Sequence, residues 1–243
     1  MPRGRPALLA LGAVLVCVLL LLLPAARRHA PARRPANATV RAGVAPGDPA
    51  VAYREAAVPR LPASSRPDVL LLHGQAFTSG TWQALGTLAL LAAEGHRAVA
   101  IDLPGYGDSP PAGSVLTQRG RAALLQRVVQ QLHLQRPVLV SPSMSGRFAL
   151  PFLLAHGEQL AGFVPIAPVG TREYSAMQYR QVQTPTLILY GDRDTGLGQQ
   201  ALQSLRHLPK HRVVVLPGTG HACYMDKPED FHRALLGFLG QLQ

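Results

Sequence analysis

Three serines separate a short apolar run from a helical pattern near the middle of the chain. The stretch VLVSPSMSGRFALPFLL holds Ser141, Ser143 and Ser145. A serine on a sharp turn between a strand and a helix is typical of a nucleophile elbow, whose usual pattern is G-x-S-x-G. Ser143 is the candidate nucleophile, because Ser141 and Ser145 are then small spacers. If Ser145 were the nucleophile, Arg147 would be a spacer and is too large. Taken alone, the motif also fits an ordinary serine-rich turn.

A serine nucleophile needs a general base and an acid that orients the base. The segment LILYGDRD places Asp192 and Asp194 after one apolar run, and LPGTGHACY places His221 after the last run. The chain order serine, aspartate, histidine is the order found when such an elbow sits on a parallel sheet. Asp194 is the better candidate acid because it lies further beyond the strand. Asp192 remains the alternative, and could instead cap the turn.

Acyl transfer also needs N–H donors for the oxyanion that forms during the reaction. The segment LLHGQAF follows an apolar run, and we expect the backbone N–H groups of Gln75 and Met144 to be these donors. We interpret His73 as a structural residue that braces this loop. Cys223 fits a small buried hydrophobic residue better than a second nucleophile. The sequence predicts no metal site and no cofactor.

Apolar runs alternate with helical patterns along most of the chain. The runs predict strands over 51–58, 68–74, 96–102, 137–141, 162–168, 184–191 and 211–216. The helical patterns cover 81–95, 121–134, 147–156, 199–209 and 228–242. Strands that are apolar throughout and alternate with helices indicate an α/β fold with a mostly parallel sheet, covered by helices on both faces. In such folds the site lies at the carboxyl ends of the strands, where the candidate residues occur.

Five segments resemble, in order, the α/β-hydrolase superfamily. They are LLHGQAFTSGTW, AIDLPGYGDS, LVSPSMSG, LILYGDRD and GHACYMDKPEDFHRALLGFL, and the resemblance covers about residues 51–243. The S-x-S-x-S elbow and the GHACY block resemble the subfamily called α/β-hydrolase domain-containing protein 14, and the apolar N-terminal stretch resembles its membrane-anchored branch. The resemblance implies an eight-stranded sheet, a Ser143–Asp194–His221 triad and a type II membrane anchor with a lumenal domain.

The loop that often carries a lid in these hydrolases is short in this chain. Residues 169–185 have room for a short helix but not for a lid domain. We therefore expect an open site that suits an acyl group on something bulky, such as a protein. The leading hypothesis is a serine hydrolase or acyltransferase that acts on esters, thioesters or amides through an acyl-Ser143 intermediate. The alternative is a catalytically weak hydrolase-like scaffold that works as an anchored protein-interaction module.

The positive charge of the chain is concentrated near its N-terminus. The formal net charge of the 243 residues is +11, but residues 1–41 hold seven arginines and no acidic residue. The remaining 17 basic residues face 13 acidic ones. Aromatic side chains are not interleaved with the basic ones, so the pattern does not indicate a nucleic-acid partner.

An uncharged apolar segment predicts a membrane anchor. Residues 6–26 would form a helix of about 31 Å, close to the ~30 Å hydrocarbon core of a bilayer. A cleaved signal peptide is the alternative, but Pro24 occupies the −3 position of the best cleavage site. The predicted organisation is a tail at 1–5, a transmembrane signal-anchor at 6–26, a juxtamembrane linker at 27–50 and the hydrolase domain at 51–243.

Two features of the sequence disagree about the orientation of this anchor. Arginines are more numerous after the apolar segment than before it, which favours a cytoplasmic domain by the positive-inside rule. In contrast, Asn37-Ala38-Thr39 is an N-glycosylation acceptor, which is meaningful only in the lumen. We expect a single-pass type II protein with a lumenal domain, and the cytoplasmic orientation stays open.

Overall fold

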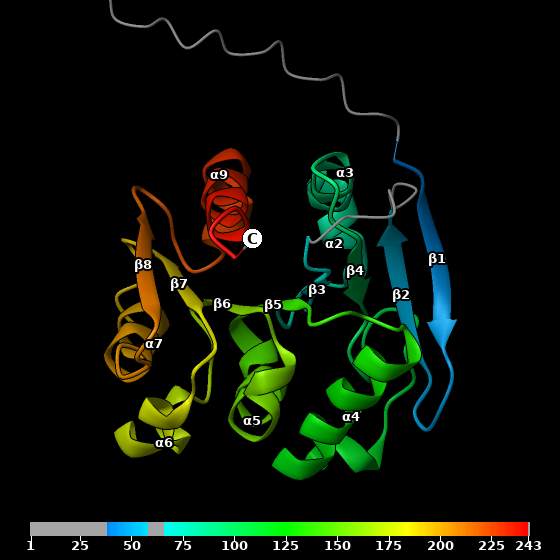
Figure 1. The fold of residues 1–243 in the computed structure, drawn as a ribbon, viewed down its shortest axis with the longest axis horizontal. Helices are drawn as coiled ribbons and strands as arrows, with labels where there is room; N and C mark the ends of the chain where they lie inside the picture. Colours follow the sequence, from blue (N-terminus) through cyan, green and yellow to red (C-terminus); the bar gives the residue numbers. More distant parts are fainter. Residues whose placement is uncertain (1–37, 58–65, 243) are drawn as a thin grey trace, which may run out of the picture. The chain divides into compact units, whose positions relative to one another are not determined.

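The computed structural model describes residues 38–57 and 66–242, which form one eight-stranded sheet with helices on both faces (Figure 1). The strands are β1 (Val40–Ala45), β2 (Val51–Ala56), β3 (Val69–Leu71), β4 (Ala98–Ile101), β5 (Val138–Pro142), β6 (Gly162–Ile166), β7 (Thr186–Gly191) and β8 (His211–Leu216). The α-helices are α2 (Ser79–Ala84), α3 (Thr87–Ala93), α4 (Gln118–Gln131), α5 (Gly146–His156), α6 (Ala176–Gln181), α7 (Leu197–Leu205), α8 (Cys223–Asp226) and α9 (Pro228–Leu239). Short 3₁₀ turns are η1 (Gly113–Leu116), η2 (Ser143–Ser145), η3 (Gly157–Gln159) and η4 (Thr171–Glu173).

The strand order is β1-β2-β4-β3-β5-β6-β7-β8, and every pair from β4 to β8 is parallel. Every residue of β3, β4, β5 and β6 is buried. This explains their continuous apolar sequences, because both faces of these strands are covered. The predicted mostly parallel sheet is confirmed.

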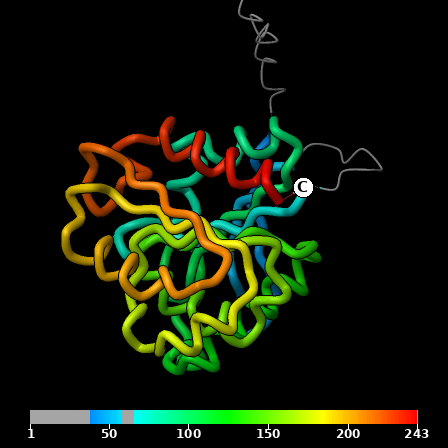
Figure 2. The backbone as a smooth tube through the Cα atoms, turned by 60° about the vertical axis from the view of Figure 1, so that its left-hand side comes forward, coloured from blue at the N-terminus to red at the C-terminus, as the bar shows by residue number. Residues whose placement is uncertain are grey.

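A layer of helices covers each face of the sheet. Helices α2, α3 and α9 lie on one face, and α4, α5, α6 and α7 lie on the other (Figure 1). Each layer packs its own apolar cluster against the strands. Figure 2 shows α9 (red) on the same side of the sheet as α3, and the Thr87 hydroxyl lies 2.8 Å from Nε2 of His232 between them. The C-terminal helix therefore closes the layer that the first helices begin.

The single helix predicted over 81–95 is wrong, because two helices occupy this region. Gly86 has a φ of +74° between α2 and α3, a left-handed conformation that a continuing α-helix cannot include. The break follows from the backbone, which the apolar periodicity of the segment does not reveal. Gly95, with a φ of +82°, ends α3 as expected.

The sheet begins earlier than the predicted boundary at residue 51. Strand β1 lies within the stretch 27–50 that the sequence assigned to a linker, and its six residues pair with β2 in antiparallel register. Most of β1 is exposed or half-buried, so its sequence lacks the apolar run that marks the inner strands. The linker assignment for 40–45 is therefore corrected.

The predicted N-terminal features lie outside the described residues. These are the tail at 1–5, the anchor at 6–26 and the glycosylation acceptor Asn37. Within 38–57 and 66–242, no helix is both long and apolar enough to cross a membrane.

Candidate active site

The candidate nucleophile lies on a sharp turn between β5 and α5. Ser143 follows the last residue of β5 directly and has a φ of +50°. A non-glycine residue in this region is uncommon, and such strain is typical of functional turns. The backbone just beyond this turn packs closely against another loop. At Gly146, a Cβ atom would lie 2.4 Å from the carbonyl oxygen of Val169. The turn therefore requires glycine at position 146, three residues beyond the candidate nucleophile.

His221 bridges the serine and one of the two candidate acids. Its Nε2 lies 2.7 Å from Oγ of Ser143, and its Nδ1 lies 2.6 Å from Oδ2 of Asp194. The Asp194 side chain is 8% exposed, whereas the His221 side chain is 39% exposed. With Nδ1–H donating to the carboxylate, Nε2 is left to accept the serine proton. The structure thus brings the three predicted triad residues together.

Three different strands carry these side chains to one edge of the sheet. Ser143 follows β5, Asp194 follows β7 and His221 follows β8. The strands are parallel, so their carboxyl ends meet at the same edge. The short helix α8 begins two residues after His221, and the hydrophobic pattern of the sequence does not predict it.

Asp192 has a different set of contacts. Its Oδ1 accepts the backbone N–H groups of Gly218 at 2.7 Å and Thr219 at 3.2 Å. These hydrogen bonds, the one from Gly218 first, lower the pKa of the carboxyl. The carboxylate therefore ties the end of β7 to the loop that leads from β8 to His221.

His73 is held as a neutral ring inside the loop after β3. Its Nδ1 lies 2.8 Å from the carbonyl oxygen of Gly74, and its Nε2 accepts the N–H of Leu103 at 3.0 Å. Burial lowers the pKa of the imidazole, so the charged form is disfavoured. Both ring nitrogens are occupied by backbone groups, which agrees with the structural role predicted from the sequence.

The loop after β3 also runs beside the candidate nucleophile. A Cβ atom at Gly74 would lie 3.6 Å from Cβ of Ser143. Gln75 is the next residue of this loop, and Met144 follows Ser143 in η2. Their backbone N–H groups remain the predicted oxyanion donors, and the proximity of Gly74 to Ser143 is consistent with that prediction.

Cys223 lies close to the site but is not poised to react. It is completely buried, and burial raises the pKa of its thiol to about 12. The thiolate is the reactive form of cysteine, so this side chain is inert at neutral pH.

Comparisons with known proteins identify the family of this chain. Residues 69–178 match the family described as "Alpha/beta hydrolase family". "Protein ABHD14A" of Danio rerio is 56% identical over 213 residues, which cover 85% of this chain and 77% of that protein. "Protein ABHD14A" of Homo sapiens is 50% identical over 243 residues, covering 100% of this chain and 89% of that protein. The chain belongs to the α/β-hydrolase family.

A second group of relatives carries a name that mentions an activity. "Putative protein-lysine deacylase ABHD14B" of Homo sapiens is 50% identical over 198 residues, covering 80% of this chain and 92% of that protein. Among solved structures, carboxylesterase CesB from Bacillus subtilis has a TM-score of 0.71 and 18% identity, covering 83% of this chain and 92% of that one. At this level of identity the structural match speaks for the fold alone.

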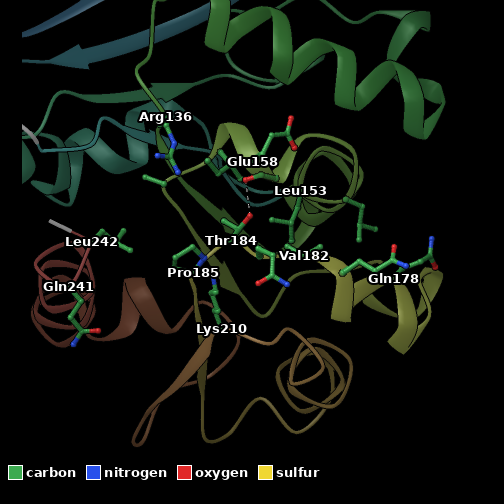
Figure 3. A pocket seen from close by; sticks show the side chains of 16 residues that line it. Arg136, Leu153, Glu158, Gln178, Val182, Thr184, Pro185, Lys210, Gln241 and Leu242 are labelled. Carbon is green, nitrogen blue, oxygen red and sulfur yellow. Dashed lines mark hydrogen bonds between the residues drawn. The ribbon is translucent and has the colours of Figure 1, made fainter.

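Two surface pockets lie at different edges of the sheet relative to the triad, and only one of them borders a triad residue. A pocket of about 840 Å³, shown in Figure 3, is lined by Arg136, Ala161, Pro185 and Lys210 among others. These four residues precede strands β5 to β8, so this pocket lies at the opposite edge of the sheet. A smaller hollow of about 380 Å³ includes Thr195, immediately after Asp194, and so borders the loop that carries the acid.

Proposed function

We propose that this α/β hydrolase is a serine hydrolase or acyltransferase that acts on acyl groups through a covalent acyl-Ser143 intermediate. The observation that carries the proposal is the position of His221, which lies within 2.7 Å of Ser143 and 2.6 Å of Asp194. A nucleophile, a base and an orienting acid in this arrangement define the triad mechanism. Esters, thioesters and amides are all acyl donors for such a site.

In the acylation step, Ser143 Oγ attacks the acyl carbonyl carbon while His221 Nε2 takes the serine proton. The hydrogen bond from Nδ1 to Asp194 holds the ring in the required tautomer and stabilises the imidazolium that forms. The N–H groups of Gln75 and Met144 stabilise the oxyanion of the tetrahedral intermediate. The intermediate collapses when Nε2 returns its proton to the departing alcohol, thiol or amine.

In the second step an acceptor removes the acyl group from the serine. His221 takes a proton from water, or from another nucleophile such as a thiol, as that nucleophile attacks the acyl-serine carbonyl. The proton then passes to Oγ of Ser143, and the free enzyme is restored. Water gives hydrolysis, and another acceptor gives acyl transfer.

An acyl-lysine on a protein is the substrate class that fits the open site best. The segment 169–185 contains only η4 and the six-residue helix α6, so a lid domain does not cover the described site. The name of the related "Putative protein-lysine deacylase ABHD14B" points to the same class. The proposed function includes attachment to a membrane through residues 6–26, with the hydrolase domain in the lumen.

Labelling with a fluorophosphonate tests the nucleophile directly. The wild-type chain should be labelled, Ser143→Ala should not, and Ser141→Ala and Ser145→Ala should still react. Undiminished labelling of Ser143→Ala would exclude this serine as the nucleophile. An acetyl-lysine peptide, followed by mass spectrometry, tests the substrate class. A wild-type chain that neither reacts with the probe nor deacylates the peptide would favour the anchored interaction module.

A further inference from the structure

The two spacer serines of the elbow are hydrogen-bonded to each other. Oγ of Ser141 lies 3.0 Å from Oγ of Ser145, and Ser145 Oγ donates to the carbonyl oxygen of Pro142 at 2.7 Å. Both serine side chains are completely buried. Each hydroxyl has one proton, and that of Ser145 is directed to Pro142. Ser141 must therefore donate to Ser145, which gives a chain of two hydrogen bonds that ends on the Pro142 carbonyl.

The end of this chain is the peptide unit that precedes the candidate nucleophile. The carbonyl of Pro142 and the N–H of Ser143 belong to one rigid plane, so the bond from Ser145 fixes that plane. The carbonyl of Ser143 accepts the N–H of Val169 at 2.9 Å, which fixes the following plane and the N–H of Met144 with it. The peptide planes before and after Ser143 are thus each fixed by a hydrogen bond, one from Ser145 and one from Val169.

This support acts where the backbone is strained. The φ of Ser143 is +50°, and a strained residue keeps such a conformation only when its surroundings hold it there. Glycine, the usual residue at positions 141 and 145 of such an elbow, has no side chain to make either hydrogen bond. The departure from the usual pattern thus adds two contacts to the turn.

We propose that Ser141 and Ser145 are positioning residues, whose hydroxyl chain locks the peptide plane before Ser143 and so aims Oγ at His221. The inference rests on the proposed function of Ser143 as the nucleophile. Ser145 acts directly on this plane, and Ser141 acts by orienting the Ser145 hydroxyl.

The rate of serine acylation tests the role of Ser145. For Ser145→Ala, the rate constant of fluorophosphonate labelling and kcat on an activated ester should each fall about tenfold, with KM unchanged and labelling still reaching one group per chain. Ser145→Gly restores the usual elbow residue and should be equally slow, because it also lacks the hydroxyl. Thr186→Val is the matched control: it removes a buried hydroxyl that donates to the Thr184 carbonyl at 3.0 Å, at the opposite edge of the sheet, and should keep the wild-type rate.

A double-mutant cycle tests the order of the chain. Ser141→Ala should also slow labelling, and Ser141→Ala combined with Ser145→Ala should be no slower than Ser145→Ala alone, because Ser141 acts through Ser145. Wild-type rates in Ser145→Ala and Ser145→Gly, or losses that multiply in the double variant, would overturn the inference. An unlabelled wild-type chain would instead count against the proposed function.

Thermal unfolding tests, without any measurement of enzyme activity, whether the hydroxyl chain fixes the peptide plane before Ser143. Ser143→Gly should raise Tm in the otherwise wild-type chain, because glycine adopts a φ of +50° without strain. In a Ser145→Ala background the peptide plane before Ser143 is no longer held, so Ser143 can relax from its strained φ. Ser143→Gly then has less strain to relieve and should raise Tm by less. Equal gains in the two backgrounds would overturn the inference, whatever the enzyme does.

Discussion

The carboxylate of Asp194 contacts the His221 imidazole, which bridges to the proposed nucleophile Ser143. In the best-studied triad, replacing this acid by its amide costs about 10⁴ in turnover and leaves the fold intact, because the imidazole loses its preferred tautomer. We expect Asp194→Asn to fold with a near-native Tm and to lose activity on an activated ester by about this factor. Ester turnover and circular dichroism measured on the same sample check both parts. An active Asp194→Asn, with Asp192→Asn inactive, would assign the acid to Asp192.

The carboxylate of Asp192 instead accepts two backbone N–H groups of the loop before His221. Folding lowers the pKa of this carboxyl from its ordinary value of 3.8. The ionised carboxylate therefore stabilises the folded protein at pH values above 3.8, and this stabilisation is lost as the pH falls through the lowered pKa. Asp192→Asn should therefore reduce Tm by a few degrees at neutral pH, keep most activity, and approach the wild type at acid pH. A Tm difference that stays constant from neutral pH to below the lowered pKa would contradict this explanation.

The placement of single residues could be predicted from the sequence where their position relative to a strand decides it. Ser143, Asp194 and His221 each follow an apolar run, and the sheet joins those ends. The hydrogen bond between the side chains of Ser141 and Ser145 could not be predicted, because it depends on side-chain rotamers and on the path of the elbow backbone. The approach of Val169 to Gly146 could not be predicted either, since it joins the start of α5 to a loop that is distant in the sequence.

At the scale of elements, the break between α2 and α3 depends on one glycine. A Cβ atom at Gly86 would meet nothing within 4 Å, so a substitution there costs only backbone strain. Gly86→Ala should lower the free energy of unfolding by about 1 to 2 kcal/mol, the cost of a left-handed conformation for alanine. Urea denaturation measures this loss. Gly113→Ala is the matched control, because Gly113 also has open space but no positive φ. Similar losses in both variants would refute the strain argument.

The buried strands were predictable as elements because they are apolar on both faces. Strand β1 was not, because it is an edge strand with most side chains half-buried or exposed, and only its pairing with β2 defines it. The division of 81–95 was also hidden, since α2 and α3 continue one apolar periodicity. The partner of a strand is set by tertiary structure, and a left-handed residue is set by the local backbone. A hydrophobic pattern predicts neither.

At the scale of the whole molecule, the proposed membrane attachment and its orientation are open to a direct test. We expect a lumenal hydrolase domain, with a glycan on Asn37 of the predicted linker. Treatment of the membrane-expressed protein with an N-glycosidase should shift its gel mobility, and Asn37→Gln should migrate like the treated protein. Digestion of sealed vesicles with a protease supplies the control, since a lumenal domain is protected. Absence of a shift, together with digestion of the domain, would establish the cytoplasmic orientation.

The wide spacing of the triad also has a consequence for biosynthesis. Ser143 and His221 lie 78 residues apart, and their hydrogen bond depends on strands β5 to β8 standing side by side. A chain emerging from the ribosome presents the serine long before the histidine has been translated. Contacts this distant in sequence form slowly, because the intervening loop must first close. Under the proposed mechanism, we expect a nascent or truncated chain to contain Ser143 but to stay inert towards acyl compounds, so that the onset of fluorophosphonate reactivity marks the completion of the sheet.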